Sequence, residues 1–370
     1  MGKRELLLIV LFVAAGAIVY RVAAPPAPPG SGSEGGGVLD KIQRAMHGNR
    51  ASATVTTTRT EALSASTREL RLDVDATEVV ITGEDRRDLA ITFAVRSTGY
   101  DEDEARRYAA AAKLGIEQGA GALIAKTDFP REASQSAVLT MKVPAGLLVR
   151  MEPTSRRTTI TNVAGIELRG ARGDTMVTRV AGRATITHRS GSLHVDGAGA
   201  LELSARNSDA RIEHVSGIVS VESHSGELAL AAIGGPIDIT SRGTEITIAD
   251  ISALQPPLRI DAASGRLQID GLRTEARIDG DNTTIAITMA SAVPLMVDNT
   301  GDAITIGVPP DGCTIDAIAT GGQITVEQLP LTPSIAGNDQ RVNGTIDGGG
   351  PPITLRATRA GITITRVSGK

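Results

Sequence analysis

A repeat of about 17 to 21 residues runs through most of the chain and limits its fold more than any other sequence feature. Each repeat holds two pairs of apolar or small residues, and one other residue separates the two members of a pair. This is the spacing of a strand with one face buried. Two short strands and two turns per repeat predict the coils of a β-solenoid, in which each coil packs on the next.

Two series of inward-facing pairs alternate along the chain, and successive members of a series are expected to stack about 4.8 Å apart. The first series is Thr158/Ile160, Thr175/Val177, Leu193/Val195, Ala210/Ile212, Leu228/Leu230, Ile246/Ile248, Leu267/Ile269, Ile285/Ile287, Ile304/Ile306 and Ile324/Val326. The second series, midway between them, is Val149/Met151, Ile166/Leu168, Ala184/Ile186, Leu201/Leu203, Val219/Val221, Ile237/Ile239, Leu258/Ile260, Ala276/Ile278, Leu295/Val297 and Cys313/Ile315. The predicted fold class is all-β, a single β-solenoid or β-helix with two short strands per coil.

Small polar residues and glycines stand at the predicted corners between strands. The stretch "ESHSGELAL" (Glu222 to Leu230) is one such corner, and "HRSGSLHV" and "AASGRLQI" have the same outline. Sharp turns need a positive φ or a side-chain hydrogen bond to the backbone, and Gly, Ser, Asn and Asp supply these. The corner is therefore expected to recur because the chain must turn.

The same stretch also contains the residue types of a hydrolase site, in Ser223, His224 and Ser225. We interpret it as a solvated polar corner, because His224 occupies the coil position that Arg189 and Arg206 occupy in preceding coils. A hydrolase would need this corner to differ from its repeats.

A metal site is the other possibility that the histidines raise. His188, His194 and His224 would form it if two coils brought them together, whereas His214 lies on the opposite turn. The ligand spacing of a recognised zinc motif is missing from the sequence. We therefore expect no metal, no cofactor and no catalytic residue.

Acidic residues invite a similar test, since β-solenoids can bind calcium or carry glycosidase carboxylates. The four acids near corners are Asp196, Asp261, Asp270 and Asp279. The glycine-rich nonapeptide of calcium-binding coils is not found in the sequence. No insertion is long enough to form the walls of a glycosidase cleft. We interpret these acids as solvated surface, and the only cysteine, Cys313, as a small buried hydrophobic residue.

Composition argues against nucleic-acid binding as the function. Aromatic residues make up 2% of the 370 residues, there is no Trp, and the net charge is -4. All of the aromatic residues precede the repeats: Phe12, Tyr20, Phe93, Tyr100, Tyr108 and Phe129. The coils therefore lack the stacking rings of single-stranded nucleic-acid binders, and no Lys/Arg run stands out, so no nucleic-acid partner is expected.

The N-terminus predicts a membrane location. Lys3 and Arg4 precede an apolar run from Leu6 to Tyr20 that continues past Arg21. We expect residues 1–24 to be an uncleaved single-pass anchor that contacts the membrane and leaves the rest extracytoplasmic. The alternative is a cleaved signal peptide and a secreted protein, which Pro25, directly after the small-residue site, disfavours.

Three segments are predicted. After the anchor at 1–24, residues 25–68 are interpreted as a Pro/Gly/Ser-rich linker and an irregular segment, and residues 69–370 as the solenoid domain. One short helix near 101–113 interrupts the β pattern, with Asp101 as its cap. It is expected to cover the first coils, because an open end would expose core and strand edges.

A family resemblance follows from several stretches taken together. An Ala-rich helix is followed by "LGIEQGAGALIAKTDFPRE", then by "AVLTMKVPAGLLVRMEPTSRRTTITNVAGIELRGARGDTMVTRVAG", and the chain closes with "PPITLRATRAGITITRV". This resembles the bacterial putative-adhesin family of β-helical envelope domains from about Glu69 to Val367, with Ile362 and Ile364 as a last inward pair. Corners such as Asn207-Ser208 and Asn282-Thr283 stand where the family usually has Ser-Gly. The resemblance implies an envelope protein with no established activity and no assigned site.

The predicted function is therefore non-enzymatic. We expect a membrane-tethered, extracytoplasmic solenoid that is adhesin-like or an envelope scaffold, acts through its surface, and has an envelope protein or a glycan as partner. Two alternatives stay open: an envelope-stress sensor or regulatory ectodomain with a membrane partner, and a β-helix carbohydrate-active enzyme.

Overall fold

The computed structural model describes residues 51–119, 121–130, 134–151, 156–251, 255–309 and 311–367. Its strands are β1 (Ala51–Ala62), β2 (Glu69–Asp73), β3 (Thr77–Glu84), β4 (Asp88–Gly99), β5 (Lys113–Gln118), β6 (Ala122–Asp128), β7 (Gln135–Pro144), β8 (Leu148–Met151), β9 (Thr158–Val163), β10 (Gly165–Arg172), β11 (Thr175–Arg206), β12 (Ser208–Val215), β13 (Val219–Ala231), β14 (Ile237–Ala249), β15 (Leu258–Leu272), β16 (Ala276–Met289), β17 (Leu295–Thr300), β18 (Ile304–Val308), β19 (Cys313–Thr320), β20 (Ile324–Glu327), β21 (Ser334–Ala336), β22 (Asp339–Ile346), β23 (Pro352–Thr358) and β24 (Ile362–Arg366). The described helix is α3 (Glu102–Ala111). The chain is thus mostly β, with one short helix among the described residues.

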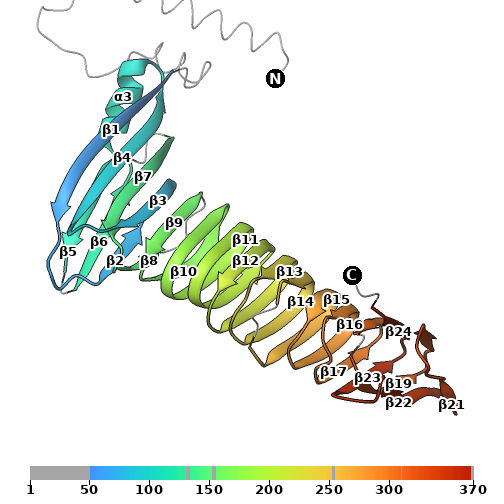
Figure 1. Ribbon diagram of the computed structural model, residues 1–370. Helices are drawn as coiled ribbons and strands as arrows, with labels where there is room; N and C mark the ends of the chain where they lie inside the picture. Colours follow the sequence, from blue (N-terminus) through green and yellow to red (C-terminus); the bar gives the residue numbers. More distant parts are fainter. Residues whose placement is uncertain are drawn as a thin grey trace, which may run out of the picture. The chain divides into compact units, whose positions relative to one another are not determined.

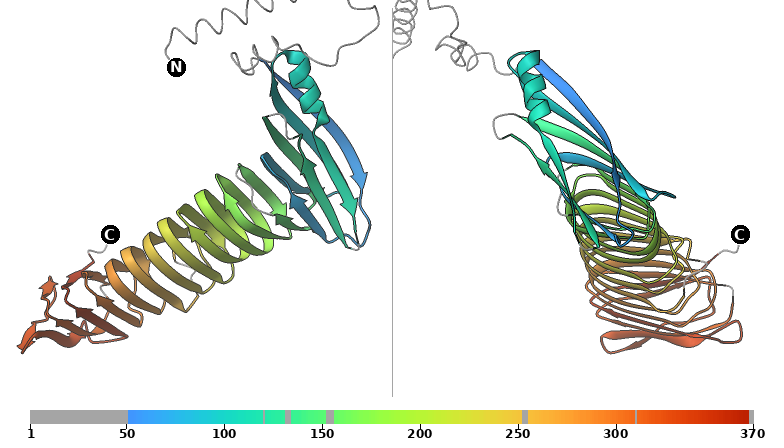
Figure 2. Two further views of the ribbon diagram at one scale, coloured as in Figure 1. Left: turned by 180° about the vertical axis from the view of Figure 1, so that it is seen from behind. Right: turned by 90° about the vertical axis from the view of Figure 1, so that its left-hand side faces the viewer.

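Parallel pairing between successive turns of the chain builds the middle of the 24-stranded sheet (Figure 1). Leu228 on β13 pairs with Ile246 on β14, which pairs with Leu267 on β15. Strands β13 to β16 each bend around a corner and carry one inward pair on either side of it. The views in Figure 2 show these turns stacked side by side as successive coils.

The interior of the stack is formed by the two predicted series of pairs. Every member is buried except Val326, which is partly exposed. Because the register places like positions in adjacent coils, Ile, Leu and Val stack on one another in rows, and Ala or Thr fills the narrower places. The predicted inward register is confirmed for these residues.

Several corners share one backbone conformation despite their different sequences. Residues Asn207, Ser225 and Asn282 have φ of 46°, 62° and 48°, so they adopt the left-handed conformation that asparagine tolerates best among residues with a side chain. The following residue must stay small at Gly226, where a Cβ would lie 2.3 Å from the carbonyl oxygen of Ser208. The Asn-Ser and Asn-Thr corners are therefore equivalents of the Ser-Gly corner.

At both ends, the order of the coils in space departs from their order in the sequence. Near the N-terminal end, β3 lies between β7 and β9, and β2 lies between β6 and β8. Near the C-terminal end, β23 lies between β17 and β19, and β24 lies between β18 and β20.

The expected stacking of Ile324/Val326 directly on Ile304/Ile306 is therefore wrong. Ile362 on β24 lies between them and pairs with Ile304 on one side and Ile324 on the other. The last inward pair of the sequence is buried as predicted, but it does not form the last coil in space. Periodicity fixes which residues face inward, but it cannot order the coils.

Antiparallel strands cover the outermost coils. β4 pairs antiparallel with β7, and β1 pairs antiparallel with β4 from Ala51 to Ala62, while β22 covers β19 at the other end. The interpretation of 25–68 as linker and irregular segment is thus wrong for 51–62, because β1 is a paired strand. Its polar, Thr-rich sequence suits an edge strand with one solvated face.

Helix α3 forms where it is predicted. The Asp101 side chain caps it by accepting a hydrogen bond of 2.8 Å from the Glu104 backbone N–H. Ala105 and Ala109 are buried, and the helix packs on β4 and β1. It therefore packs on the strands that cover the first coils, whereas the expectation was that it would cover those coils itself.

The predicted anchor at 1–24 and the linker up to residue 50 lie outside the described residues. Within the described ranges, no helix combines the length and the apolar character that a membrane crossing requires.

Substitutions in the inward rows should destabilise the protein far more than substitutions at the surface. Val219→Asp or Leu228→Asp would bury an unpaired carboxylate, because both side chains are at most 1% exposed, and should lower the free energy of unfolding by about 3 kcal/mol or more. Glu222→Ala, on an exposed side chain of the same strand, should change it by about 0.5 kcal/mol or less. Chemical denaturation of the three variants measures this, and the opposite ranking would refute the register.

The position of the last coil in space gives a second prediction. Ending the chain after Gly350 removes β23 and β24, which should expose both the β17/β18 coil and the β19/β20 coil to rapid amide exchange. If the last coil lay at the end of the stack, only the β19/β20 coil would lose protection. Hydrogen-exchange mass spectrometry of the full and shortened chains distinguishes the two orders.

Candidate functional site

The clearest cluster of charged side chains lies on the outer face of the first coils. Outward positions of β2, β8 and β10 come side by side there, because Arg71 pairs in register with Arg150, and Arg150 with Glu167. Glu69 and Arg169 occupy neighbouring outward positions on β2 and β10. Parallel register thus gathers five charged residues from segments up to about 100 residues apart in the sequence.

Arg150 is at the centre of this charged cluster. Its Nη1 donates to Glu69 Oε1 and Oε2 at 3.0 and 3.1 Å, and its Nε lies 2.7 Å from Glu167 Oε2. Arg71 also donates to Glu69, and Arg169 Nε donates to Glu167 Oε1 at 2.7 Å. Each carboxylate is therefore shared by two guanidinium groups.

Electrostatics keep the cluster ionised. The hydrogen bond from Arg169, aided by the charge of Arg150, lowers the pKa of Glu167 despite partial desolvation. The hydrogen bond to Glu69 and its negative charge raise the pKa of Arg71. A carboxylate held in this way is a poor proton acceptor, so the arrangement favours binding or structural support over acid–base catalysis.

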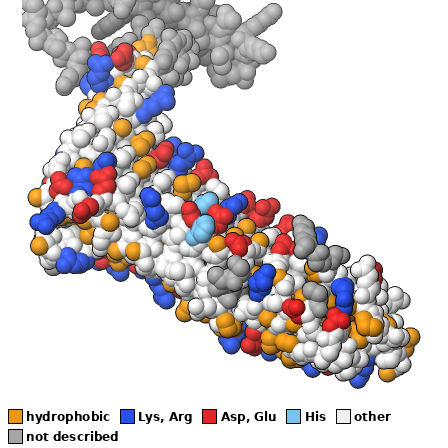
Figure 3. All heavy atoms as spheres, in the orientation of Figure 1, with side chains coloured by type: hydrophobic (Ala, Val, Ile, Leu, Met, Phe, Trp, Pro, Cys, Tyr) orange, Lys and Arg blue, Asp and Glu red, His pale blue; other side chains and the backbone are white. Residues whose placement is uncertain are grey.

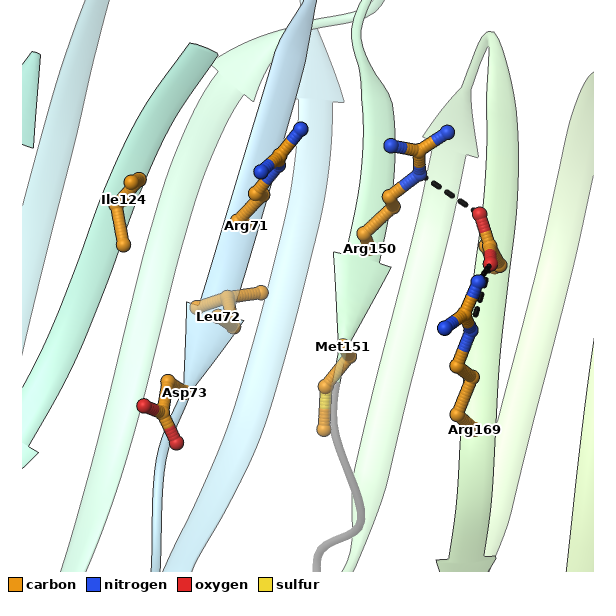
Figure 4. A pocket seen from close by; sticks show the side chains of 8 residues that line it. Arg71, Leu72, Asp73, Ile124, Arg150, Met151 and Arg169 are labelled. Carbon is orange, nitrogen blue, oxygen red and sulfur yellow. Dashed lines mark hydrogen bonds and ion pairs between the residues drawn. The ribbon is translucent and has the colours of Figure 1, made fainter. Parts of the chain in front are cut away.

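A surface hollow of about 320 Å³ opens beside the cluster (Figure 4). Its lining combines Arg71, Arg150, Glu167 and Arg169 with Leu72, Asp73, Ile124 and Met151. The described lining contains no serine, cysteine or histidine that could act as a nucleophile or shuttle protons. Three guanidinium groups against two acids give the hollow a mixed polar character.

The corner from Glu222 to Leu230 divides into inward and outward residues. Ser223 points into the stack, is 1% exposed, and accepts a hydrogen bond of 3.3 Å from Thr244. His224 lies partly exposed on the outer side, and Ser225 is exposed at the left-handed turn. The three side chains thus lie in different environments of the coil, which supports the interpretation of this stretch as a structural corner.

The structure does not bring the histidines together at one site. His194 lies 3.4 Å from Glu213, and His214 Nδ1 lies 2.8 Å from Asp196 Oδ1. His224 pairs in register with Arg206, as the sequence repeat indicated. Within the described ranges, no cluster of three or more His, Cys, Asp or Glu side chains could hold a metal ion.

His188 is fully buried inside the stack. Its Nδ1 lies 2.8 Å from Ser208 Oγ, and its Nε2 lies 3.2 Å from the Gly173 carbonyl oxygen. Burial lowers the pKa of His188, so the neutral ring is favoured. In that form Nε2–H donates to the Gly173 carbonyl oxygen, while the Ser208 hydroxyl beside Nδ1 also lies 2.7 Å from the Arg206 carbonyl oxygen and can donate to only one of the two.

The other residues considered from the sequence have structural surroundings. Asp279 accepts a 2.9 Å hydrogen bond from Arg277, and Asp270 accepts one of 2.9 Å from Gln268. Asp261 is exposed on the outer face of β15. Cys313 is buried, and its burial raises the pKa of the thiol. None of these residues lines the hollow beside Arg150.

The cluster around Arg150 was not predicted from the sequence. Glu69 and Arg71 reach Arg150 only because β2 is inserted between β6 and β8, as the pairings of Glu69 with Ala122 and with Leu148 show. The only sequence signal is the alternation of opposite charges in "ELRLD" and "IELRG". That alternation identifies exposed strand faces, but it does not indicate which faces meet.

Together, the described residues define a mostly β protein with one large sheet, one short helix and charged outer faces. Residues 67–249 match the family described as Toastrack DUF4097. This match confirms the predicted resemblance to the bacterial putative-adhesin family over those residues. No curated protein matches the chain.

Solved bacterial structures also align with the chain. A putative cell adhesion protein from Clostridium sporogenes aligns at 8% identity and a TM-score of 0.20, over 85% of this chain and 100% of its own. Putative adhesins from Bacteroides fragilis and Parabacteroides distasonis align at 10% and 11% identity with TM-scores of 0.25 and 0.27, each over 85% of this chain and 97% of its own. At these scores the alignments establish neither a shared function nor a shared site.

The buried His188 predicts a pH dependence of stability. The unfolded chain should bind its proton near pH 6.5, the ordinary value, whereas the folded protein binds it only at lower pH. The free energy of unfolding should therefore fall as pH drops below about 6.5. Denaturation from pH 7.5 to 5.5 measures the slope, which should be smaller for His188→Gln; equal slopes would contradict the assignment.

Proposed function

We propose that this protein is a β-solenoid of the cell envelope that acts by binding through its outer surface and carries no enzymatic activity. The observation that supports this most directly is the parallel register of the coils, which repeats outward side chains in rows along the stack. Such rows favour binding spread over several coils. The Toastrack DUF4097 match over 67–249 agrees with the proposal.

The chemistry of the described surface also supports binding over catalysis. Of the two acids that line the hollow beside Arg150, Asp73 and Glu167, Glu167 is held by Arg150 and Arg169, so it is poorly placed to act as the acid or the base of a glycosidase pair with Asp73. At the corner, Ser223 is buried while His224 lies partly exposed on the outer side. The described residues therefore offer no candidate active site for the enzyme alternative.

The location is part of the proposal. Residues 1–24 would anchor the chain in the membrane through one apolar helix, with Lys3 and Arg4 inside and the solenoid extracytoplasmic. Cleavage of that segment would give a secreted form. The partner would then be another component of the envelope, a protein or a glycan.

The binding function can be separated from catalysis by one pair of variants. His224→Ala and Ser190→Ala change equivalent corners of different coils, so each should bind envelope preparations nearly as well as the original chain. Neither protein should show turnover above background on ester, peptide or glycan substrates.

The opposite result would identify an active site. If the original chain hydrolysed one of these substrates, and His224→Ala abolished turnover while Ser190→Ala kept it, the corner would be catalytic. Thermal melts of both variants confirm that the fold is retained. Failure of the original chain to bind any envelope preparation would refute the proposed function itself.

A further inference from the structure

A row of basic side chains follows one corner of the stack, one residue per coil. It consists of Arg172, Arg189, Arg206, His224 and Arg242, which we call the arginine row. Arg206 pairs in register with His224, and His224 with Arg242. At the start of the row the register shifts: Ala171 pairs with His188 but Arg172 pairs with Ser190, so Arg172 lies on the coil adjacent to Arg189 without pairing with it.

The arginines of the row, unlike those of the charged cluster around Arg150, carry charges that no ion pair with described residues neutralises. Arg172, Arg189, Arg206 and Arg242 are exposed, and their guanidinium groups form no ion pair or hydrogen bond with any residue that the structure describes. By contrast, Arg150 and Arg169 are held by Glu167. Like charges spaced at the strand separation, about 4.8 Å, repel one another, so a bound anion would relieve that repulsion.

A hollow in the surface lies over the first three arginines. It measures about 560 Å³ and is lined by Arg172, Arg189 and Arg206 together with Thr187, Ser204 and Asn207, above the buried His188. Hydroxyl and amide groups thus stand beside the guanidinium groups. A ligand with both anionic and hydroxyl groups could bind to both kinds of side chain.

The charges beside the arginine row favour a linear ligand over a flat one. Asp209, Glu227 and Glu245 are exposed three residues beyond Arg206, His224 and Arg242, so an acidic row runs beside the arginine row. A flat anionic membrane would bring its charges over both rows at once. A linear polyanion can follow the arginine row alone.

Two observations disfavour nucleic acid as that polyanion. The aromatic residues all precede the coils of the row, so no ring is available there on which bases could stack. A duplex carries about one negative charge per 1.7 Å of its axis, which is much denser than one basic side chain per coil. One charge per coil suits a chain with one acid group per sugar ring, whose length is comparable to the strand separation.

We propose that the arginine row binds an acidic polysaccharide with one carboxylate on each sugar, aligned with the axis of the stack. Each guanidinium takes one carboxylate in a two-pronged hydrogen bond, and Thr187, Ser204 and Asn207 bind sugar hydroxyls. This inference rests on the proposed function, because it names the class of partner for the same outer surface.

The test uses the full chain in detergent micelles and polygalacturonate as the probe, with binding measured by calorimetry at two salt concentrations. The original chain should bind, and more weakly at high salt. Arg189→Ala/Arg206→Ala should weaken binding about tenfold or more. Arg189→Lys/Arg206→Lys should lie between the two, because lysine keeps the charge but loses the paired geometry.

A matched control removes the same net charge elsewhere. Arg259 and Arg273 are exposed, lie outside the arginine row, and form no ion pair with described residues. Arg259→Ala/Arg273→Ala should therefore bind polygalacturonate within about twofold of the original chain. Equal losses in the two double variants would show that only net charge matters, and would overturn the proposal.

Other outcomes show whether the polysaccharide inference or the proposed function itself is wrong. Tighter binding to duplex DNA or to phosphatidylglycerol vesicles, lost in Arg189→Ala/Arg206→Ala, would replace the polysaccharide by that partner. Binding of envelope preparations without binding of polygalacturonate would overturn the inference and leave the proposed function standing. If the original chain bound neither envelope preparations nor polygalacturonate, the proposed function would be refuted as well.

Discussion

The structure depends on one constraint, the fixed register of the parallel hydrogen-bond ladder between coils. A slip of one residue would turn every inward side chain outward, so each coil must repeat the same positions. The pairing of Leu228 with Ile246 and of Ile246 with Leu267 shows this repetition across three coils. Corners must then turn in the same way, which is why Asn207, Ser225 and Asn282 share a positive φ despite their different side chains.

A ladder of this kind leaves unpaired strand edges at its two ends, and the chain covers them in the same manner at both. Antiparallel strands, β4 with β1 at one end and β22 at the other, cover the outermost coils. The first and last coils of the sequence each lie one place inward, between two other coils. The first and last coils of the sequence are therefore paired on two sides, and the antiparallel strands cover edges that would otherwise pair with another chain.

The same register that builds the core also arranges the surface. Around Arg150 it brings opposite charges together and produces a neutralised cluster, and along the arginine row it repeats one charge without a partner. The two arrangements have different physical consequences. The first stabilises adjacent coils modestly, as exposed ion pairs do. The second leaves a line of positive potential for which a linear anion is the natural complement.

Local periodicity was sufficient to predict much of the fold. The inward pairs, the corner positions and the helix capped by Asp101 follow from neighbours a few residues apart, and the structure confirms them. The strand β1 was missed because its Thr-rich sequence has no apolar alternation, and it becomes a strand only by pairing with β4. Sequence also identified His224 as the counterpart of Arg206, the first sign of the arginine row.

What the sequence determined by itself is which side chains face inward, because that depends only on a strand period of two and on turns at regular intervals. The tertiary structure decided which coils are neighbours. Ile362 lies between Ile304 and Ile324, and Glu69 reaches Arg150, only because distant segments pair. Any coil with the same inward pattern can stack on any other, so periodicity cannot specify the order, and the end strands and their loops must.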